Sequence, residues 1–385
     1  MTLRKSIFWC HLVAGLTAGA VIAIMSVTGI AIAFEEEILR WYDRRVSRLD
    51  SVSEKGKAPL PIAELTRKIE ADHTGAKVSS IAMFSDPERA WEVYLGDDGP
   101  FYLDPFTGST QASQTHGAHE IIHKLEEWHR WLGDNDGLTS TGRIVTGVSN
   151  LAFVVLCVTG LYLWFPRRWS WRALRPLLLL KTSYKGKARD FNWHNVFGFW
   201  ALPVVVALSV TAVVISFEWG HRLVFILVGE EAPKSRTYGM MAVPPPVVLP
   251  PVPGTSPVPL DTSFPRIAAA FPDWESITLE AIPDPVGSPL EPLEFGVTVP
   301  DNMPSRGYIP VKSHPFTGEI LQQVRLQDRS VGLQARVWIR FLHTGAAFGL
   351  PGKIVASLAT AAVLVLVWTG FALSWRRFFH KSRSV

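Results

Sequence analysis

The chain has 385 residues, of which 48% are hydrophobic and 19% are charged, and its formal net charge is +4. Both cysteines, Cys10 and Cys157, lie in apolar stretches, which excludes a disulfide framework, a Cys-x-x-Cys zinc or redox site and covalent c-type haem attachment. A Gly-x-Gly-x-x-Gly motif and a Walker loop are absent from the sequence, so it contains no nucleotide-binding motif.

Four apolar segments without Asp, Glu, Lys or Arg follow one another along the chain. They lie between Lys5 and Glu35, between Arg143 and Arg167, between Asp190 and Glu218, and between Lys353 and Arg376. Each segment has about 22 to 29 residues, and about 20 apolar residues are enough for a helix to cross the hydrocarbon core of a bilayer. We therefore predict a membrane α-helical protein with four transmembrane helices.

These segments divide the chain into alternating membrane and outside parts. The predicted order is span one (1–34), a first outside domain (35–128), an interfacial His segment with span two (129–166), a basic loop (167–190), span three (191–218), a second outside domain with a Pro-rich insertion (219–342), an interfacial His segment with span four (343–376), and a tail (377–385). Span one is about twice as long as the apolar core of a signal peptide, so we expect it to remain uncleaved.

Basic residues mark one side of the membrane. Fourteen of the 38 Lys and Arg residues, with Asp190 as the one acid among them, lie before span one, in the 167–190 loop and after span four. By the positive-inside rule, both termini are cytoplasmic and both long loops are outside. The positive charge thus reflects topology, and we expect the lipid bilayer rather than a nucleic acid as the partner.

The chain repeats itself at two constant offsets. Spans one and three align at an offset of 183, which places His11 on His194 and Thr28 on Thr211. Spans two and four align at an offset of 210, as do the two Pro-Phe-Thr-Gly sequences at 105–108 and 315–318. We infer two copies of a unit made of span, outside domain and span. The second copy is 27 residues longer, and the Pro-rich stretch 243–260 is the expected insertion.

Each outside domain is expected to be α+β, with a helix followed by short strands. The expected elements are a helix at 61–70 and strands at 90–95 and 101–103 in the first domain, and a helix at 262–270 and strands at 276–282, 294–299 and 308–311 in the second. Each Pro-Phe-Thr-Gly sequence is expected to form a hairpin turn with its glycine at positive φ. No catalytic constellation is present in these domains, which favours a binding or scaffolding role for them.

Several motifs resemble the PepSY-associated transmembrane family over nearly the whole chain. They are the His-x-x-x-Gly openings of spans one and three, the Leu-Glu-Glu-Trp-His-Arg-Trp segment around His129, the Phe-Leu-His-Thr-Gly segment around His343, and two turns similar to the PepSY Asp-Pro-x-Thr-Gly, the second with His314 in place of Asp. The resemblance implies a bacterial inner-membrane protein with two periplasmic PepSY-like domains. Length and layout are most similar to the ferric-siderophore reductases, which bind haem and release iron from ferrioxamine-type chelates.

Four histidines are predicted to be haem ligands. His11 and His194 lie at equivalent places inside spans, where an imidazole is costly and normally faces a partner or a cofactor. His129 and His343 precede spans two and four, near the opposite face. Span one covers about 34 Å between these levels, so each iron must be shared within one level. We expect His11 to pair with His194 and His129 with His343, each pair holding one b-type haem. A mutual hydrogen bond between the paired histidines is the alternative.

Other residues have weaker claims to a function. Arg130 and Arg340, and Arg189 with Lys5, could pair with haem propionates or serve interfacial charge roles. A macrocycle or a neighbouring helix could approach closely at the glycines of the spans, which are Gly15, Gly198, Gly29, Gly160 and Gly370. The cluster His116, His119 and His123 could bind a metal or mark the acceptor site. We expect structural roles, on the surface or in hydrogen bonds, for His73, His221, His314 and His380.

Taken with the resemblance, these features predict a di-haem membrane oxidoreductase that passes electrons from a membrane or cytoplasmic donor to a periplasmic ferric siderophore and releases iron as Fe(II). Two alternatives stay open. One is a non-enzymatic membrane-anchored PepSY module that binds or regulates a partner, and the other is a haem reductase of a different periplasmic acceptor.

Overall fold

The computed structural model describes residues 2–49, 58–73, 75–96, 100–134, 140–166, 169–233, 246–248, 258–280, 291–300, 304 and 308–379. Most of the expected Pro-rich insertion, Arg167, Arg168 and the tail with His380 lie outside these residues. The chain splits into two compact units. The helical unit comprises Met1–Glu35, Glu120–Ala232 and Ala335–Val385, and the sheet unit comprises Glu36–His119 and Pro233–Gln334.

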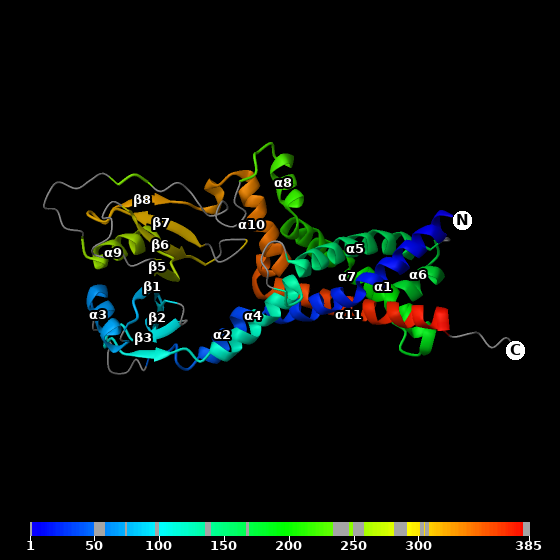
Figure 1. Ribbon diagram of the computed structural model, residues 1–385, viewed down its shortest axis with the longest axis horizontal. Helices are drawn as coiled ribbons and strands as arrows, with labels where there is room; N and C mark the ends of the chain where they lie inside the picture. The colour runs from blue at the N-terminus through cyan, green and yellow to red at the C-terminus, as the bar shows by residue number, and fades with distance from the viewer. Residues whose placement is uncertain are drawn as a thin grey trace. The chain divides into compact units, whose positions relative to one another are not determined.

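Four long helices build the helical unit (Figure 1). They are α1 (Leu3–Ile32), α5 (Thr141–Trp164), α7 (Gly186–Ser216) and α11 (Gly349–Phe379). Each is long and apolar enough to cross a membrane, the last one in a continuous stretch counted from Ala346. The prediction of four membrane helices is therefore confirmed by length and composition.

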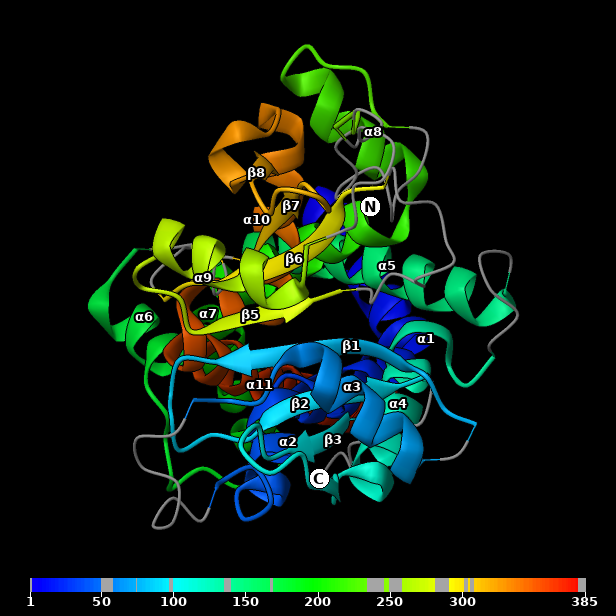
Figure 2. The same cartoon turned by 90° about the vertical axis from the view of Figure 1, so that its left-hand side faces the viewer.

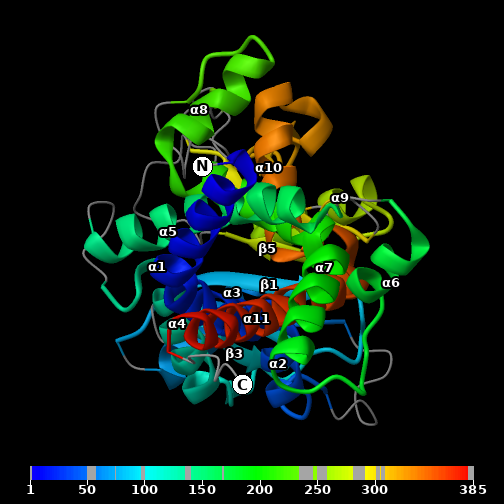
Figure 3. The same cartoon turned by 90° about the vertical axis from the view of Figure 1, so that its right-hand side faces the viewer.

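The long helices pack in a closed ring (Figure 3). Both α1 and α7 contact α5 and α11, so α1 and α7 lie diagonally opposite each other. Small side chains fill the interior between them, including Ala18, Cys157, Ala201 and Ala359. Without a hydrophobic driving force between helices in lipid, such small residues allow the backbones to approach and gain van der Waals contact.

Shorter helices connect the long ones. They are α2 (Glu35–Asp43), α4 (His116–Trp131), α6 (Trp171–Leu178), α8 (Glu218–Leu227), α10 (Val331–Thr344) and the 3-10 helices η2 (Leu326–Asp328) and η3 (Ala346–Phe348). α4 precedes α5 along the chain, and α10 precedes α11. A Cβ on Gly142 would overlap the carbonyl oxygen of Trp131, and one on Gly352 would overlap that of Gly345. These glycines let each short helix fold back closely onto the start of the following span.

The sheet unit contains one antiparallel sheet of eight strands (Figure 2). Its strands are β1 (Val78–Phe84), β2 (Trp91–Leu95), β3 (Pro100–Leu103), β4 (Thr110–Ala112), β5 (Ser276–Leu279), β6 (Leu293–Thr298), β7 (Ile309–Ser313) and β8 (Ile320–Gln323). They lie in the order β4-β3-β2-β1-β5-β6-β7-β8. Two four-stranded meanders are thus joined through their first strands.

The junction of β1 with β5, called the seam below, differs from the expectation of two separate domains. The strands pair from Ile81 opposite Leu279 to Phe84 opposite Ser276. Without this pairing, β1 and β5 would each be an edge strand with unpaired backbone groups, which favours pairing with another strand. The two segments that were expected to be separate domains therefore share one sheet and one compact unit.

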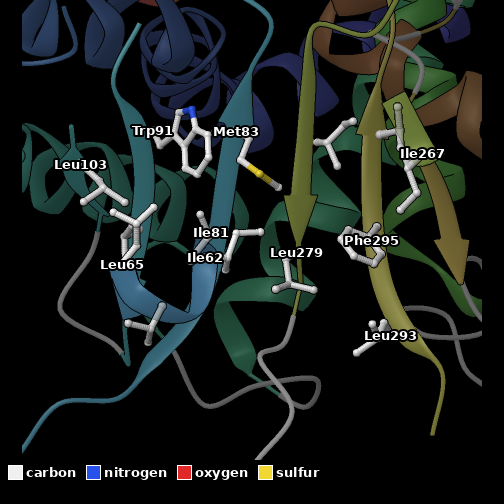
Figure 4. Packing of buried hydrophobic residues seen from close by; sticks show 14 of the residues in the cluster. Ile62, Leu65, Ile81, Met83, Trp91, Leu103, Ile267, Leu279, Leu293 and Phe295 are labelled. Carbon is white, nitrogen blue, oxygen red and sulfur yellow. The ribbon is translucent and has the colours of Figure 1, made fainter. Parts of the chain in front are cut away.

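Two helices, α3 (Ile62–Asp72) and α9 (Leu260–Ala270), cover one face of the sheet. Their apolar side chains meet those of strands from both meanders in a single cluster, and Figure 4 shows Met83 and Ile81 of β1 near Leu279 of β5. Ile81, Leu279 and Ile267 are fully buried. The core is thus continuous across the seam.

The two Pro-Phe-Thr-Gly turns form as predicted. Gly108 and Gly318 have φ of 78° and 68°, in the left-handed region that favours glycine. Asp104 accepts a hydrogen bond at 2.8 Å from the backbone N–H of Phe106, and Nδ1 of His314 accepts the equivalent bond from Phe316 at 3.1 Å. His314 therefore replaces the aspartate of the first turn in its capping role.

Candidate functional site

The helical unit brings the four predicted ligands together as two pairs. His11 of α1 and His194 of α7 approach each other across the ring of helices, with ring centroids 6.4 Å apart and planes at 82°. His129 of α4 and His343 of α10 also have centroids 6.4 Å apart, with planes at 49°. The pairing follows the two levels expected from the depth of the histidines in the spans.

In the His11–His194 pair, each ring is held by a threonine on a neighbouring helix. Nδ1 of His11 lies 2.9 Å from Oγ1 of Thr159, and Nδ1 of His194 lies 2.9 Å from Oγ1 of Thr369. Each hydroxyl donates its own proton at 2.7 Å to a carbonyl of its helix, Val155 or Val365. Since that proton is used, the threonine oxygen accepts from Nδ1–H.

In the His129–His343 pair, backbone carbonyls accept the hydrogen bond from Nδ1 of each ring. Nδ1 of His129 lies 2.9 Å from the carbonyl oxygen of Met25, and Nδ1 of His343 lies 3.0 Å from that of Leu208. A carbonyl oxygen only accepts, so both Nδ1 atoms carry a proton. Thr28 and Thr211 are further contacts of these rings, at 3.2 and 3.3 Å.

These bonds fix the tautomer of all four imidazoles. Because Nδ1 carries the proton, Nε2 has the free lone pair that a metal needs. A ligating histidine normally donates its other N–H to a carbonyl or similar acceptor, which orients the ring. The hydrogen bonds of all four rings therefore match those of histidine ligands in metal sites.

The spacing of the rings also fits a shared metal ion. Two metal–nitrogen distances of about 2 Å, with about 1.1 Å from each nitrogen to its ring centre, give a centroid separation of about 6.3 Å for linear ligation. Both observed separations are 6.4 Å. Among the described residues, no group of three His, Cys, Asp or Glu is placed to hold a metal. Each pair can supply two nitrogen ligands to such an ion.

Glycines leave room for two of these rings. A Cβ on Gly29 would lie 2.9 Å from Cε1 of His129, and one on Gly160 would lie 3.2 Å from Cε1 of His11. Gly15 and Gly198, which we expected beside the inner histidines, make ordinary contacts of 3.7 and 3.5 Å with leucine side chains. Ring packing thus requires Gly29 and Gly160 more than Gly15 or Gly198.

The arginines near the pairs have different surroundings. Arg130 is exposed and pairs with Glu126 at 2.6 Å, and Arg340 is exposed on α10. Arg189 binds Oδ1 of Asp190 through Nε and Nη2, at 3.0 and 2.9 Å. The guanidinium of Arg189 is therefore already paired with a protein carboxylate, which disfavours the propionate role among the two considered for it.

The remaining histidines have other surroundings. His116, His119 and His123 are exposed on α4, and His123 lies 3.6 Å from Glu127. His73 bonds Thr110 at 3.1 Å. His221 is fully buried in α8, with its ring edge toward Phe225 at 5.1 Å. Of the two structural roles expected for His221, burial excludes the one on the surface and leaves the one inside the protein.

Sequence reasoning did not assign the residues that orient the rings. Thr28, Thr211, Thr159 and Thr369 were visible only as matches between the spans. The hydrogen bonds recur at the same offsets, since Thr28 and Thr211 are 183 residues apart and Thr159 and Thr369 are 210 apart. The sequence signal for these residues was a threonine at matching positions of the two repeats, within otherwise apolar spans.

Comparison with known proteins agrees with this architecture. The family model described as the PepSY-associated TM region matches residues 8–377, which includes α5, α7, most of α1 and α11, and both histidine pairs. A search of curated proteins finds no match to the chain. With nearly its whole length matched, the chain belongs to the PepSY-associated transmembrane family.

Proposed function

We propose that the chain is a di-haem reductase of the bacterial inner membrane that passes electrons outward to a periplasmic ferric siderophore. The observation that carries this proposal is the geometry of the two histidine pairs. In each pair the ring centroids are 6.4 Å apart, and Nδ1 makes a hydrogen bond, so Nε2 can bind a metal. Imidazole suits iron, and a porphyrin supplies the four ligands that each pair lacks.

The chain's own residues would hold two b-type haems. His11 and His194 would hold one of them, and His129 and His343 the other. Arg130 and Arg340, both exposed near the second pair, would serve its propionates, Arg130 by exchanging its surface partner Glu126. When bound, haem supplies reversible one-electron chemistry, whose potential depends on axial ligands, burial and nearby charge. The protein holds the imidazoles in one tautomer and one orientation through the bonds to Nδ1.

The two levels suit electron transfer across a bilayer. His129 contacts Met25 and Thr28, which follow His11 by 14 and 17 residues on α1, so the pairs are about 21–26 Å apart along the helix. With the termini cytoplasmic, as the basic residues favour, the His11–His194 pair is on the cytoplasmic side and the His129–His343 pair on the periplasmic side. The recurrence of the threonine bonds supports an internal twofold repeat.

At the acceptor, the protein would only need to deliver an electron to the ferric iron. Reduction of ferric iron to Fe(II) weakens a chelate of hard oxygen ligands, which then releases its metal. The sheet unit, with two PepSY-like halves, would lie in the periplasm and serve binding rather than chemistry. The electron donor would come from the membrane or the cytoplasm.

Optical spectra of the purified protein test the proposal. We expect two b-type haems per chain by pyridine haemochrome, a dithionite-reduced spectrum, and reoxidation on addition of a ferric siderophore. His11→Ala and His194→Ala should each lose one haem, and His129→Ala and His343→Ala the other.

The controls separate the other candidate functions. His73→Ala, which alters a histidine of the sheet unit, should keep both haems. A colourless wild-type protein would overturn the haem assignment and favour a binding or regulatory module. Two haems that react with other oxidants, but not with ferric siderophores, would point to a different periplasmic acceptor.

A further inference from the structure

A hollow of about 350 Å³ lies over the seam, on the sheet face opposite α3 and α9. Along β1 and β5, Ile81 and Leu279 point into the core, so the alternate residues Ser80, Thr278 and Glu280 point to the other face. Strands of both meanders contribute to its lining. Its volume falls within the range of small-molecule sites.

Carboxylates set the charge of this hollow, which we call the seam hollow. Glu92 and Glu280 both line it, with the ring of Tyr94. Burial raises the pKa of Tyr94, and the charges of Glu92 and Glu280 raise it further, so both carboxylates act on the same place. Arg89 pairs with Glu92 at 2.8 Å and lies over the Phe84 ring at 3.5 Å.

Glu280 is held by a neutral donor. The hydroxyl of Tyr308 donates a hydrogen bond to Glu280. Gly296 makes this possible, because a Cβ there would collide with both the Tyr308 ring and the Glu280 carboxylate. A phenol orients the carboxylate without neutralising it. Of the two acids in the seam hollow, Glu92 is therefore paired with Arg89, whereas the described residues place a phenol and no cation against the Glu280 carboxylate.

We propose that the seam hollow binds an organic ligand through an ammonium group placed on Glu280. The hydroxyls of Ser80 and Thr278 offer hydrogen bonds to the polar remainder of the ligand, and Phe84 offers an apolar surface. Under the proposed function, on which this identification of the ligand rests, the class is a ferric chelate that carries a free amine. The seam hollow then selects the substrate by charge.

A matched pair of chelates tests this selection. The probes are a linear ferric trihydroxamate that ends in a free amine and the same chelate with that amine acetylated, each titrated into the full-length protein in detergent. We expect the wild type to bind the amine form about tenfold more tightly, the effect of one charge-assisted hydrogen bond. Glu280→Gln keeps the acceptor for Tyr308 but removes the charge, so the preference should disappear.

Glu294→Gln is the control variant. Glu294 is an exposed acid on the neighbouring strand β6, pairs with Lys312 at 2.6 Å and does not line the hollow. It should keep the tenfold preference. Tyr308→Phe, which removes only the hydroxyl, should weaken the preference and serves as the second variant if Glu280→Gln unfolds in a thermal melt.

The outcomes distinguish this inference from the proposed function. Equal binding of both chelates by the wild type, or a preference that survives Glu280→Gln, overturns the inference, even if both chelates reoxidise the reduced protein. A Glu280-dependent preference supports the ammonium site, even if the protein contains no haem and reduces neither chelate.

Discussion

Four hydroxyl groups decide how the two histidine pairs can act. Thr159 and Thr369 have their protons bound to carbonyls of their own helices, so their oxygens face Nδ1 of His11 and His194 as acceptors. Thr28 and Thr211 likewise donate to Ile24 and Ala207. A threonine in an apolar span thus satisfies its own hydroxyl and fixes the tautomer of a histidine on another helix.

Removing one of these hydroxyls should loosen a cofactor without removing its ligand. For Thr159→Val, whose side chain has nearly the same shape, we expect about 10- to 100-fold weaker haem binding at the His11–His194 pair. Titration of haem into the stripped protein measures this. Thr360→Val is the control, because its hydroxyl bonds only Ala356 of its own helix at 2.8 Å. Equal effects of the two variants would contradict a role for Thr159 in orienting the ring.

A single methyl group at Gly29 should displace His129. The added Cβ would lie 2.9 Å from Cε1 of the ring, closer than real Cβ contacts allow. Under the proposed function, we therefore expect pyridine haemochrome to give two haems per chain for the wild type and one for Gly29→Ala. Gly15→Ala, with 3.7 Å to Leu156, should retain both. Full occupancy in Gly29→Ala would show that His129 does not need this position.

At this scale the sequence predicts which histidines pair better than it predicts the residues that hold their rings. His11 and His194 stand out because an imidazole in an apolar span needs a reason. Thr159 does not, because threonine commonly bonds its own helix in such spans. For Arg189 the sequence left open a propionate partner or an interfacial role, and its guanidinium donates to the neighbouring Asp190. The acceptor that a polar side chain contacts depends on how its helix is rotated about its own axis. The order of residues in the sequence does not determine that rotation.

Among the elements, α7 begins earlier than the position of charged residues in the sequence predicts. The apolar segment was expected to begin at 191, yet α7 begins at Gly186 and includes Asp190. Asp190 is fully buried, and its two oxygens meet Arg189 at 2.9 Å and Arg376 of α11 at 3.0 Å. The carboxylate is paired, so it is tolerated inside the helix and ties the start of α7 to the end of α11.

Loss of this carboxylate should weaken the helical unit. Asp190→Ala leaves two guanidinium groups facing each other, but both are about one-third exposed, so we expect a loss of about 1–3 kcal/mol rather than the full cost of breaking a buried pair. A lower Tm in detergent is the measurement. Glu218→Gln removes an exposed partner of Arg222 and should leave Tm unchanged. The same Tm for both variants would argue against the tie.

The sheet elements differ in how visible they are in the sequence. β2 alternates from Trp91 to Leu95 and is close to its expected range, and α3 and α9 begin and end within two residues of theirs. β1 was not predicted. Ile81, Ala82 and Met83 are buried in succession, so the strand lacks the alternation that marks a half-exposed strand.

For the whole molecule, the seam is the main departure from the sequence-based description. Two copies of an α+β segment suggest two domains, since a repeat shows similarity but not which edges pair. Because the pairing passes through Ile81 and Leu279 in one core, damage on one side of the seam should affect both meanders.

Leu279→Ala tests this cooperativity. The side chain is fully buried, so its truncation should cost about 2–5 kcal/mol of unfolding free energy. We expect one lowered transition, followed by fluorescence of Trp91 in the first meander and Trp274 beside the second. Val331→Ala, at a site 58% exposed, should leave the transition unchanged. Separate transitions for the two tryptophans would show independent halves.

The seam also has a consequence for assembly. Two separate half-length proteins would have to meet by diffusion before β1 could pair with β5, and their complex would dissociate on dilution. In one polypeptide the same encounter is intramolecular, with an effective concentration set by the chain that connects the strands. Formation of the sheet therefore does not depend on how many copies of the protein the membrane contains.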